Sequence, residues 1–233
     1  DEADEAKYIV KSITSTSDNY NQFSILYRTN AQSRALEEAL IAAGVPYRIY
    51  GGLKFYDRKE IRDMIAYLRL IKNPSDDISL RRIINVPARK IGKTTVDKIA
   101  AAAEREGVSM LSAIKEHKDT LGASVVAFYD LIDGLCKLSK EVSIADLVNE
   151  VYERTGYRLF LENDEKAEDR TANVEELISG AANYENNAEN PSFDDYMDNL
   201  ALVSDIDNYD EEIDAAILMT MHAAKGLEFP IVF

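Results

Sequence analysis

The sequence predicts a partial α/β domain interrupted by a large all-helical insert, so that the chain is mostly helical overall. Three observations favour this fold. Strand-like segments alternate with a helix in the first 50 residues. From about residue 57 to residue 204, apolar residues recur almost everywhere at helical spacing. Strand character returns at 215–221 and 230–233.

The α/β part is expected to begin with a helix and to continue as strand, helix and strand, at 1–13, 23–28, 31–43 and 45–50. Gly44 is a typical stop for the second helix, and the Gly51-Gly52 pair ends the second strand. Because short loops join a strand, a helix and a strand, we expect part of a parallel α/β sheet.

The insert is expected to follow a helix that starts at Asp57 and Glu60, which resemble a capping box, and that ends at Asn73-Pro74. Further helices are expected at 76–85, 94–106, 109–117, 123–139, 143–154, 172–187 and 192–203. The sequence therefore predicts a discontinuous sheet domain, 1–73 with 213–233, and a helical domain, 74–212. The apolar strand at the C-terminal end and the helix at the start lead us to expect a piece of a longer protein.

Charge is unevenly distributed along the 233 residues, whose formal net charge is −15. Residues 47–105 hold 14 Lys or Arg against 7 Asp or Glu, whereas residues 141–214 hold 4 against 22. A basic stretch can bind phosphates on an acidic protein because salt screens distant charges. The alternative to a binding role is that both stretches are ordinary solvated helix faces, and for the acidic stretch this alternative is favoured.

Cysteine use and hydropathy indicate a cytoplasmic protein without a membrane partner. Cys136 is the single cysteine, so no disulfide can form within the chain, and no apolar run reaches the length of a membrane span. The N-terminal residues do not resemble a secretory signal. The two histidines, His117 and His222, are far apart in the sequence, and no metal site is expected.

The segment Gly92-Lys93-Thr94 has the ending of a nucleotide-binding phosphate loop, G-x-x-x-x-G-K-[ST]. The position of the loop's first glycine is held by Pro87, which lacks both the N–H group and the backbone freedom that this loop requires. A nucleotide-binding loop is therefore excluded here.

The same segment instead resembles a helix-hairpin-helix, with a short turn between two helices. Thr94 or Thr95 is expected to cap the second helix, whose N–H groups and dipole favour a phosphate. The basic residues expected around this site are Arg81, Arg82, Arg89, Lys90 and Lys93. Such a site would hold a nucleic-acid backbone without reading bases; an ordinary turn with solvated lysines is the alternative.

Three segments, "ILYRTNAQSRALEEAL" (25–40), "PYRIYGGLKFYDRKEIRDMIAYLRLI" (46–71) and "MTMHAAKGLEFPIVF" (219–233), resemble the superfamily 1 DNA helicases of the UvrD/PcrA/Rep type. The resemblance covers essentially the whole chain, and "HAAKGLEF" is highly specific. It implies that the sheet domain is a partial RecA-like domain belonging to the second motor domain, 2A, and that the all-helical insert is domain 2B.

The resemblance also implies the roles of individual residues. Single-stranded DNA would contact Arg28, Asn30 and Lys54. The ATP cleft and its coupling to DNA would involve Thr220, His222, Lys225 and Glu228, with Glu228 accepting a hydrogen bond from the ribose. Duplex DNA would contact Lys90, Ile91, Gly92, Lys93, Thr94 and Thr95. Here Lys90 replaces the first glycine of the family's usual G-I-G, although a positive φ at that position would favour glycine.

The resemblance implies a parent helicase that uses ATP and Mg²⁺ and moves 3′ to 5′ in DNA repair or replication. This chain holds neither a phosphate loop nor a magnesium-binding carboxylate pair, so we expect no catalytic residue, bound cofactor or ATPase activity in it alone. Two alternatives remain open: a non-catalytic module for repair or transcription proteins, and a part of a helicase–nuclease relative.

Overall fold

The computed structural model describes residues 2–17, 19–205 and 214–233. The chain divides into two compact units: a sheet unit, Asp1–Arg58 with Asn199–Phe233, and a helical unit, Lys59–Asp198. The first boundary thus lies near Arg58 and not near residue 73, because the helix between these positions packs with the helices that follow it. The other expected boundary, between residues 212 and 213, lies outside the described residues. In the described ranges, no helix has the length and apolar character that a membrane span requires.

The sheet unit contains the parallel sheet that the sequence predicts. Its strands are β1 (Phe23–Tyr27), β2 (Tyr47–Ile49), β3 (Ala216–Thr220) and β4 (Ile231–Val232). Their order is β2-β3-β1-β4, and every pairing is parallel. Tyr27 of β1 pairs with Thr220 of β3, so two segments far apart in the sequence end at the same edge of the sheet.

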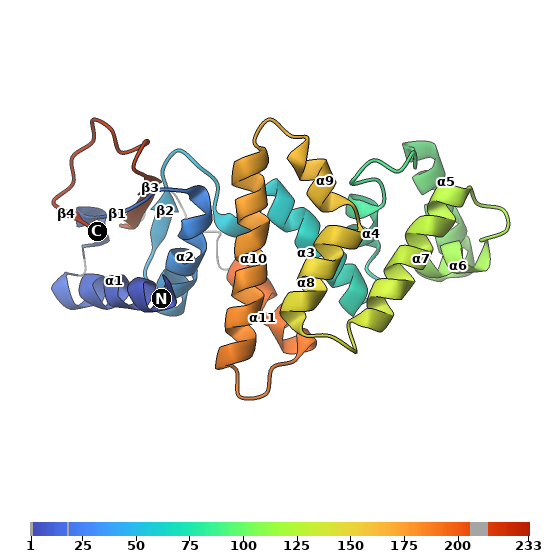
Figure 1. The fold of residues 1–233 in the computed structure, drawn as a ribbon, viewed down its shortest axis with the longest axis horizontal. Helices are drawn as coiled ribbons and strands as arrows, with labels where there is room; N and C mark the ends of the chain where they lie inside the picture. The colour runs from blue at the N-terminus through green and yellow to red at the C-terminus, as the bar shows by residue number, and fades with distance from the viewer. Residues whose placement is uncertain (1, 18, 206–213) are drawn as a thin grey trace. The chain divides into compact units, whose positions relative to one another are not determined.

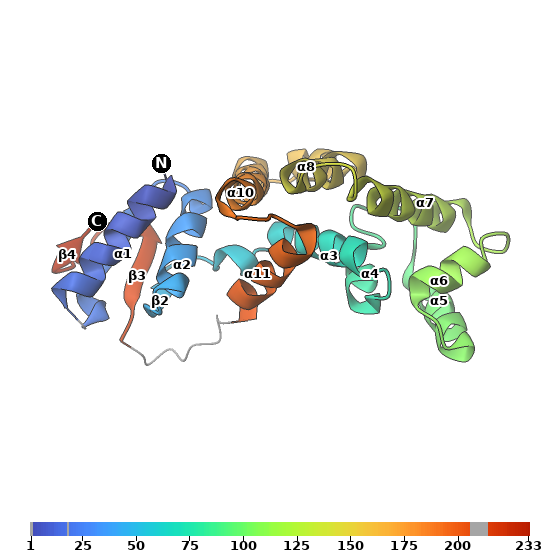
Figure 2. The same ribbon diagram turned by 90° about the horizontal axis from the view of Figure 1, so that it is seen from below.

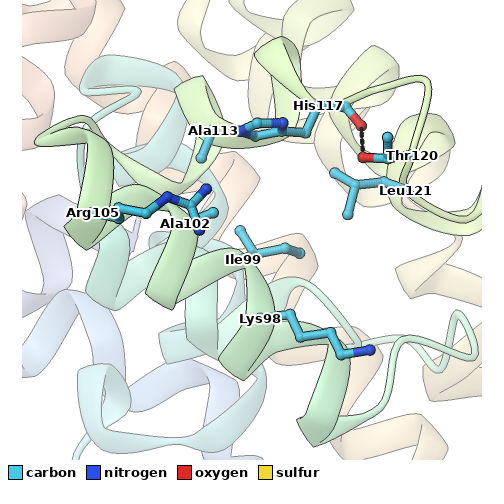
Figure 3. Close-up of a pocket in the computed structure, with 8 residues that line it drawn as sticks. All are labelled: Lys98, Ile99, Ala102, Arg105, Ala113, His117, Thr120 and Leu121. Carbon is cyan, nitrogen blue, oxygen red and sulfur yellow. Dashed lines mark hydrogen bonds between the residues drawn. The ribbon is translucent and has the colours of Figure 1, made fainter.

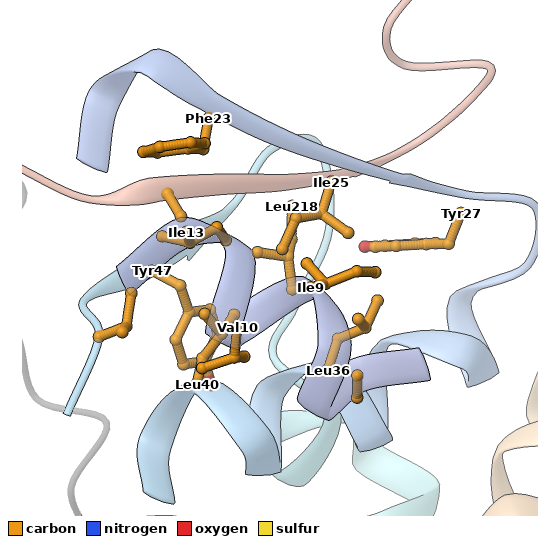
Figure 4. Close-up of a cluster of buried hydrophobic side chains, with 13 residues drawn as sticks. Ile9, Val10, Ile13, Phe23, Ile25, Tyr27, Leu36, Leu40, Tyr47 and Leu218 are labelled. Atoms are coloured by element: carbon orange, nitrogen blue, oxygen red, sulfur yellow. The ribbon is translucent and has the colours of Figure 1, made fainter. Parts of the chain in front are cut away.

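One face of this sheet is covered by α1 (Glu2–Thr16) and α2 (Ser33–Ala42), which lie side by side (Figure 2). Helical spacing on α1 brings Ile9 and Ile13 against strand residues such as Ile25 and Leu218 (Figure 4). After α2 the chain turns at Gly44, whose φ of 66° explains the glycine expected at that stop. The core therefore covers one face of the sheet and does not cover the carboxyl ends of its strands.

The helical unit is built from consecutive helices with short joins (Figure 1). They are α3 (Lys59–Lys72), α4 (Asp77–Ile83), α5 (Lys93–Glu106), α6 (Met110–Glu116), α7 (Ala123–Leu138), α8 (Ile144–Arg154), α9 (Tyr157–Glu162), α10 (Ala167–Asn187) and the first part of α11 (Phe193–Asp205). Asp76, Ser109 and Ser143 cap three of them through their side chains. In the core, α3 packs against α4, α7, α8 and α10.

One local expectation is wrong, and one helix was not expected. The capping box at Asp57 and Glu60 does not form: Asp57 ends a 3₁₀ turn, and the buried Glu60 accepts a hydrogen bond from Asn173 at 2.6 Å. The sequence analysis also missed α9, a six-residue helix in which Tyr157 donates a hydrogen bond to the buried Asp63. Both contacts join residues about 100 positions apart, so local patterns did not reveal them.

Candidate nucleic-acid interface

The carboxyl edge of the sheet gathers the residues that follow three strands. Arg28 follows β1, Tyr50 follows β2 and Met221 follows β3. The backbone pairing continues past the strand ends, because Met221 N donates to Tyr27 O at 2.8 Å and Tyr50 N donates to Leu218 O at 2.9 Å. In open parallel sheets this edge is the usual place for ligands.

Arg28 and Asn30 lie in the turn between β1 and α2. Gln32 accepts hydrogen bonds from the N–H groups of Arg28 and Thr29, and Thr29 and Gln32 form a capping box. This turn fixes the backbone, while the Arg28 side chain is exposed and has no partner among the described residues. The guanidinium is therefore available for a phosphate.

The loop after β3 carries the residues expected at the ATP cleft. Thr220 is the last residue of β3, and its hydroxyl oxygen accepts a hydrogen bond from Ala223 N at 3.2 Å. His222 and Lys225 lie in the turn region that follows, Glu228 comes after it, and all three residues are exposed. In the part of the chain that the structure describes, no side chain pairs with Lys225 or Glu228.

The loop between β2 and α3, which carries Lys54, is held by the buried carboxylate of Glu37. Phe55 N donates to Glu37 Oε2 at 3.1 Å, Tyr47 donates its hydroxyl to the same atom at 3.0 Å, and Ser33 donates to Oε1 at 2.5 Å. Burial raises the pKa of Glu37 to about 7, although these donors oppose the rise. Lys54 is partly buried, with its ammonium 5.2 Å from the ring centre of Tyr47.

Arg58 connects the same loop to the Asn30 turn. Its guanidinium donates to Asn30 O at 2.9 Å and to Ser33 Oγ at 2.7 Å, and it lies 4.0 Å from Glu37 Oε1. Both Arg58 and Glu37 are buried. The structure thus joins the backbone segments of Asn30 and Lys54 through two ionisable side chains that the sequence analysis did not single out.

The helix-hairpin-helix segment between α4 and α5 lies in the helical unit. Its turn is held by Arg89, which donates to Tyr67 Oη at 2.7 Å, to Thr155 O at 3.0 Å and to Ile83 O at 3.0 Å. The Asn85 side chain accepts from Arg89 N at 2.7 Å and from Ile91 N at 3.2 Å. The turn is therefore preorganised by contacts with α3 and with Thr155, the residue that follows α8.

These contacts correct the expected set of phosphate-binding cations. Arg89 is engaged inside the unit, and Arg82 forms an ion pair with the buried Asp63 at 2.7 Å. Arg81, Lys90 and Lys93 are exposed and have no partner within the described ranges. Three of the five expected cations therefore remain available for a phosphate.

The turn's backbone also differs from expectation. Lys90 has a φ of 61° and so adopts the left-handed conformation that glycine usually occupies. Gly92 has a φ of −80° and is the N-cap of α5, with Lys93 as the first helical residue, so neither Thr94 nor Thr95 caps the helix. Ile91 is buried, and its contribution to a ligand is limited to the backbone.

A hollow of about 260 Å³ lies on the helical unit beside α5 and α6 (Figure 3). Ile99, Ala113 and Leu121 line it together with Lys98 and His117. Arg105 donates a hydrogen bond to Glu106 and His117 is hydrogen-bonded to it as well, and these contacts keep the pKa of that carboxyl below its usual range. The sequence analysis singled out none of this lining as a site. In the described ranges, no group of three or more His, Cys, Asp or Glu is placed to hold a metal ion.

The chain is similar to known helicases over its full length. A family model described as the UvrD-like helicase C-terminal domain matches residues 1–233. The ATP-dependent DNA helicase PcrA of Staphylococcus epidermidis is 45% identical over 245 aligned residues, and that of Staphylococcus aureus is 44% identical over the same length. Each alignment covers 100% of this chain and 33% of the relative, so the chain spans about one third of the length of these curated relatives.

Proposed function

The chain belongs to the UvrD-like helicase family, and from this premise we propose that it forms the part of an ATP-dependent DNA helicase that contacts both single-stranded and duplex DNA. The match confirms the family that the three quoted segments predict. In this proposal the sheet unit is part of motor domain 2A and the helical unit is domain 2B.

The single observation that carries the proposal is the exposed Arg28 guanidinium at the carboxyl edge of the sheet, beside the loop that follows β3. Arg28 contacts a phosphate of single-stranded DNA, Asn30 contacts phosphate or sugar, and Lys54 adds a further phosphate contact. Such contacts position a strand without reading its sequence.

The hairpin of the helical unit contacts the backbone of duplex DNA. Lys90 and Lys93 present exposed ammonium groups at the start of α5, where the helix dipole favours an anion. Gly92 leaves open space, because a Cβ at this residue would meet no atom within 4 Å. Thr94 and Thr95 lie in the first turn of α5 and contribute hydroxyl and N–H groups.

ATP and Mg²⁺ belong to the whole protein, and this chain contributes one wall of the ATP cleft. The exposed carboxylate of Glu228 can accept a hydrogen bond from a ribose hydroxyl. Thr220 at the end of β3, and His222 and Lys225 in the loop that follows, precede Glu228 in the sequence and couple the ATP cleft to DNA. The phosphate loop and the magnesium-binding carboxylates are supplied outside this chain. Movement in the 3′ to 5′ direction is part of the proposal and rests on the family.

The proposal is tested by equilibrium binding of the intact protein to a duplex with a 3′ single-stranded tail, over a range of salt concentrations. Arg28→Ala is expected to weaken binding of the tail and to reduce the salt slope by about 0.7, the value for one phosphate of a single strand. Changing Lys90 and Lys93 together to Glu is expected to weaken duplex binding. Unchanged affinity in both variants would contradict the proposal and favour a protein-interaction module.

A further inference from the structure

An exposed apolar surface lies at the same edge of the sheet as Arg28. Tyr50 is 53% exposed, Leu53 is 62% exposed and Met221 is 65% exposed. Their loops approach each other, because a Cβ built on Gly51 would lie 3.7 Å from the Cβ of Ala223. Phe55 and Tyr56, the other aromatic residues of this segment, are buried.

Side-chain alternation puts Tyr50, Met221 and Arg28 on one face of the sheet. Tyr47, Leu218 and Tyr27 belong to the core under α1 and α2. Tyr50 follows Tyr47, Met221 follows Leu218 and Arg28 follows Tyr27, each by an odd number of positions, and the backbone pairing continues to Tyr50 and Met221. Because side chains alternate between the two faces of a strand, each of these edge residues lies on the face opposite to the core. Neighbouring strands are about 4.8 Å apart, and the register places Arg28 two residues further along the strands than Tyr50, so the backbones of these two residues lie roughly 12 Å from each other.

The loop that carries Tyr50 and Leu53 is fixed at both ends. At the start, Tyr50 N donates to Leu218 O at 2.9 Å. At the end, Arg58 Nε donates to Leu53 O at 3.4 Å, and Phe55 N donates to the buried Glu37 carboxylate. An aromatic ring on a fixed backbone loses little conformational freedom when it binds a ligand, which favours binding.

We propose that Tyr50, flanked by Leu53 and Met221, stacks on an unpaired base of the DNA strand whose phosphate Arg28 contacts. A flat aromatic ring on the same face of the sheet as an exposed cation matches the two parts of a nucleotide, because a base has a π-face and a phosphate has negative charge. This inference rests on the proposed function and adds to it a base contact that reads no sequence, since every base offers a π-face.

The test uses the intact protein and fluorescence anisotropy with two labelled oligonucleotides, oligo-dT and the same strand with abasic sites. Tyr50→Ala is expected to lower affinity for oligo-dT by about 5- to 150-fold, the range for loss of one stacked base. On the abasic strand the loss is expected to be less than about 2-fold, because no base is present there for Tyr50 to stack on. Tyr50→Phe keeps the ring and is expected to bind as the unchanged protein does.

Tyr8→Ala is the matched control, because Tyr8 is 69% exposed on α1 of the same unit. The salt slope is expected to stay unchanged in Tyr50→Ala, since stacking releases no counterions. An equal loss on both strands, or no loss on either, would overturn the stacking proposal. If Arg28→Ala weakens binding and Tyr50→Ala does not, the stacking proposal fails alone; if neither weakens binding, the proposed function of this edge fails with it.

Discussion

The buried carboxylate of Glu37 accepts a hydrogen bond from the backbone N–H of Phe55, at 3.1 Å to Oε2. The two residues are 18 positions apart, and the bond joins helix α2 to the loop that carries Lys54. A buried acceptor that binds a loop's backbone fixes the loop's position, because breaking the bond would leave the N–H of the buried Phe55 without an acceptor. The same carboxylate also receives hydrogen bonds from Tyr47 and Ser33.

The stability of the chain is expected to fall with rising pH through Glu37. Its folded-state pKa, about 7, lies above the ordinary glutamate value of 4.5, so the folded state holds the proton more tightly than the unfolded state does. The contribution is complete below pH 4.5 and is lost as the pH rises to 7, a change of roughly 3 kcal/mol. Urea unfolding of the unchanged protein and of Glu37→Gln, from pH 4.5 to 8, measures it.

Glu37→Gln lacks the titrating group, so the difference in unfolding free energy between the two proteins should change with pH over this window. Glu38→Gln, in the neighbouring and partly exposed carboxylate of the same helix, is the matched control. A difference that stays constant from pH 4.5 to 8 would show that Glu37 does not titrate there.

Arg58→Lys is expected to lower the free energy of unfolding by about 2 kcal/mol, although the charge is conserved. The guanidinium donates to Asn30 O, Ser33 Oγ and Leu53 O from one planar group, and an ammonium cannot reproduce these directions. Chemical unfolding measures the loss. Arg48→Lys, at an exposed residue of β2, should change stability by less than about 0.5 kcal/mol. Equal effects in both variants would contradict the structural role of Arg58.

Arg89→Lys is expected to destabilise the helical unit by about 3 kcal/mol and to weaken duplex binding. The Arg89 guanidinium joins the hairpin turn to Tyr67 of α3 and to the carbonyl of Thr155, and its loss leaves those buried groups without their donor. The exposed Arg81, changed to Lys, is the control. Chemical unfolding measures the loss of stability, and duplex-binding titrations measure the loss of affinity. An unchanged free energy of unfolding in Arg89→Lys would show that the turn does not depend on the Arg89 guanidinium.

These examples show what the sequence could and could not reveal. The basic hairpin was predictable, because the cations of residues 81–93 stand close together in the sequence. The sequence could not show that Arg89 is hydrogen-bonded inside the unit while Lys90 is exposed. This difference depends on the φ of Lys90 and on two distant acceptors, Tyr67 Oη and Thr155 O. The parallel sheet followed from local strand and helix patterns, whereas the strand order required pairings across about 190 residues. The role of Glu37 could not be predicted either, because the loop that it holds, at Phe55, lies 18 positions away in the sequence.

Lys90→Gly is expected to stabilise the chain and at the same time to weaken duplex binding. With a φ of 61°, Lys90 bears a left-handed strain of about 1 kcal/mol that glycine does not, so the free energy of unfolding should rise by about that amount. The lost ammonium should reduce the salt slope of duplex binding by about 0.9, the value for one phosphate.

The control is Lys93→Gly, at the first residue of the right-handed helix α5, where no such strain exists and stability should fall by up to about 1 kcal/mol. Since both variants lose one exposed cation, they should weaken duplex binding alike while shifting stability in opposite directions, and a loss of stability in Lys90→Gly would refute the strain at this turn.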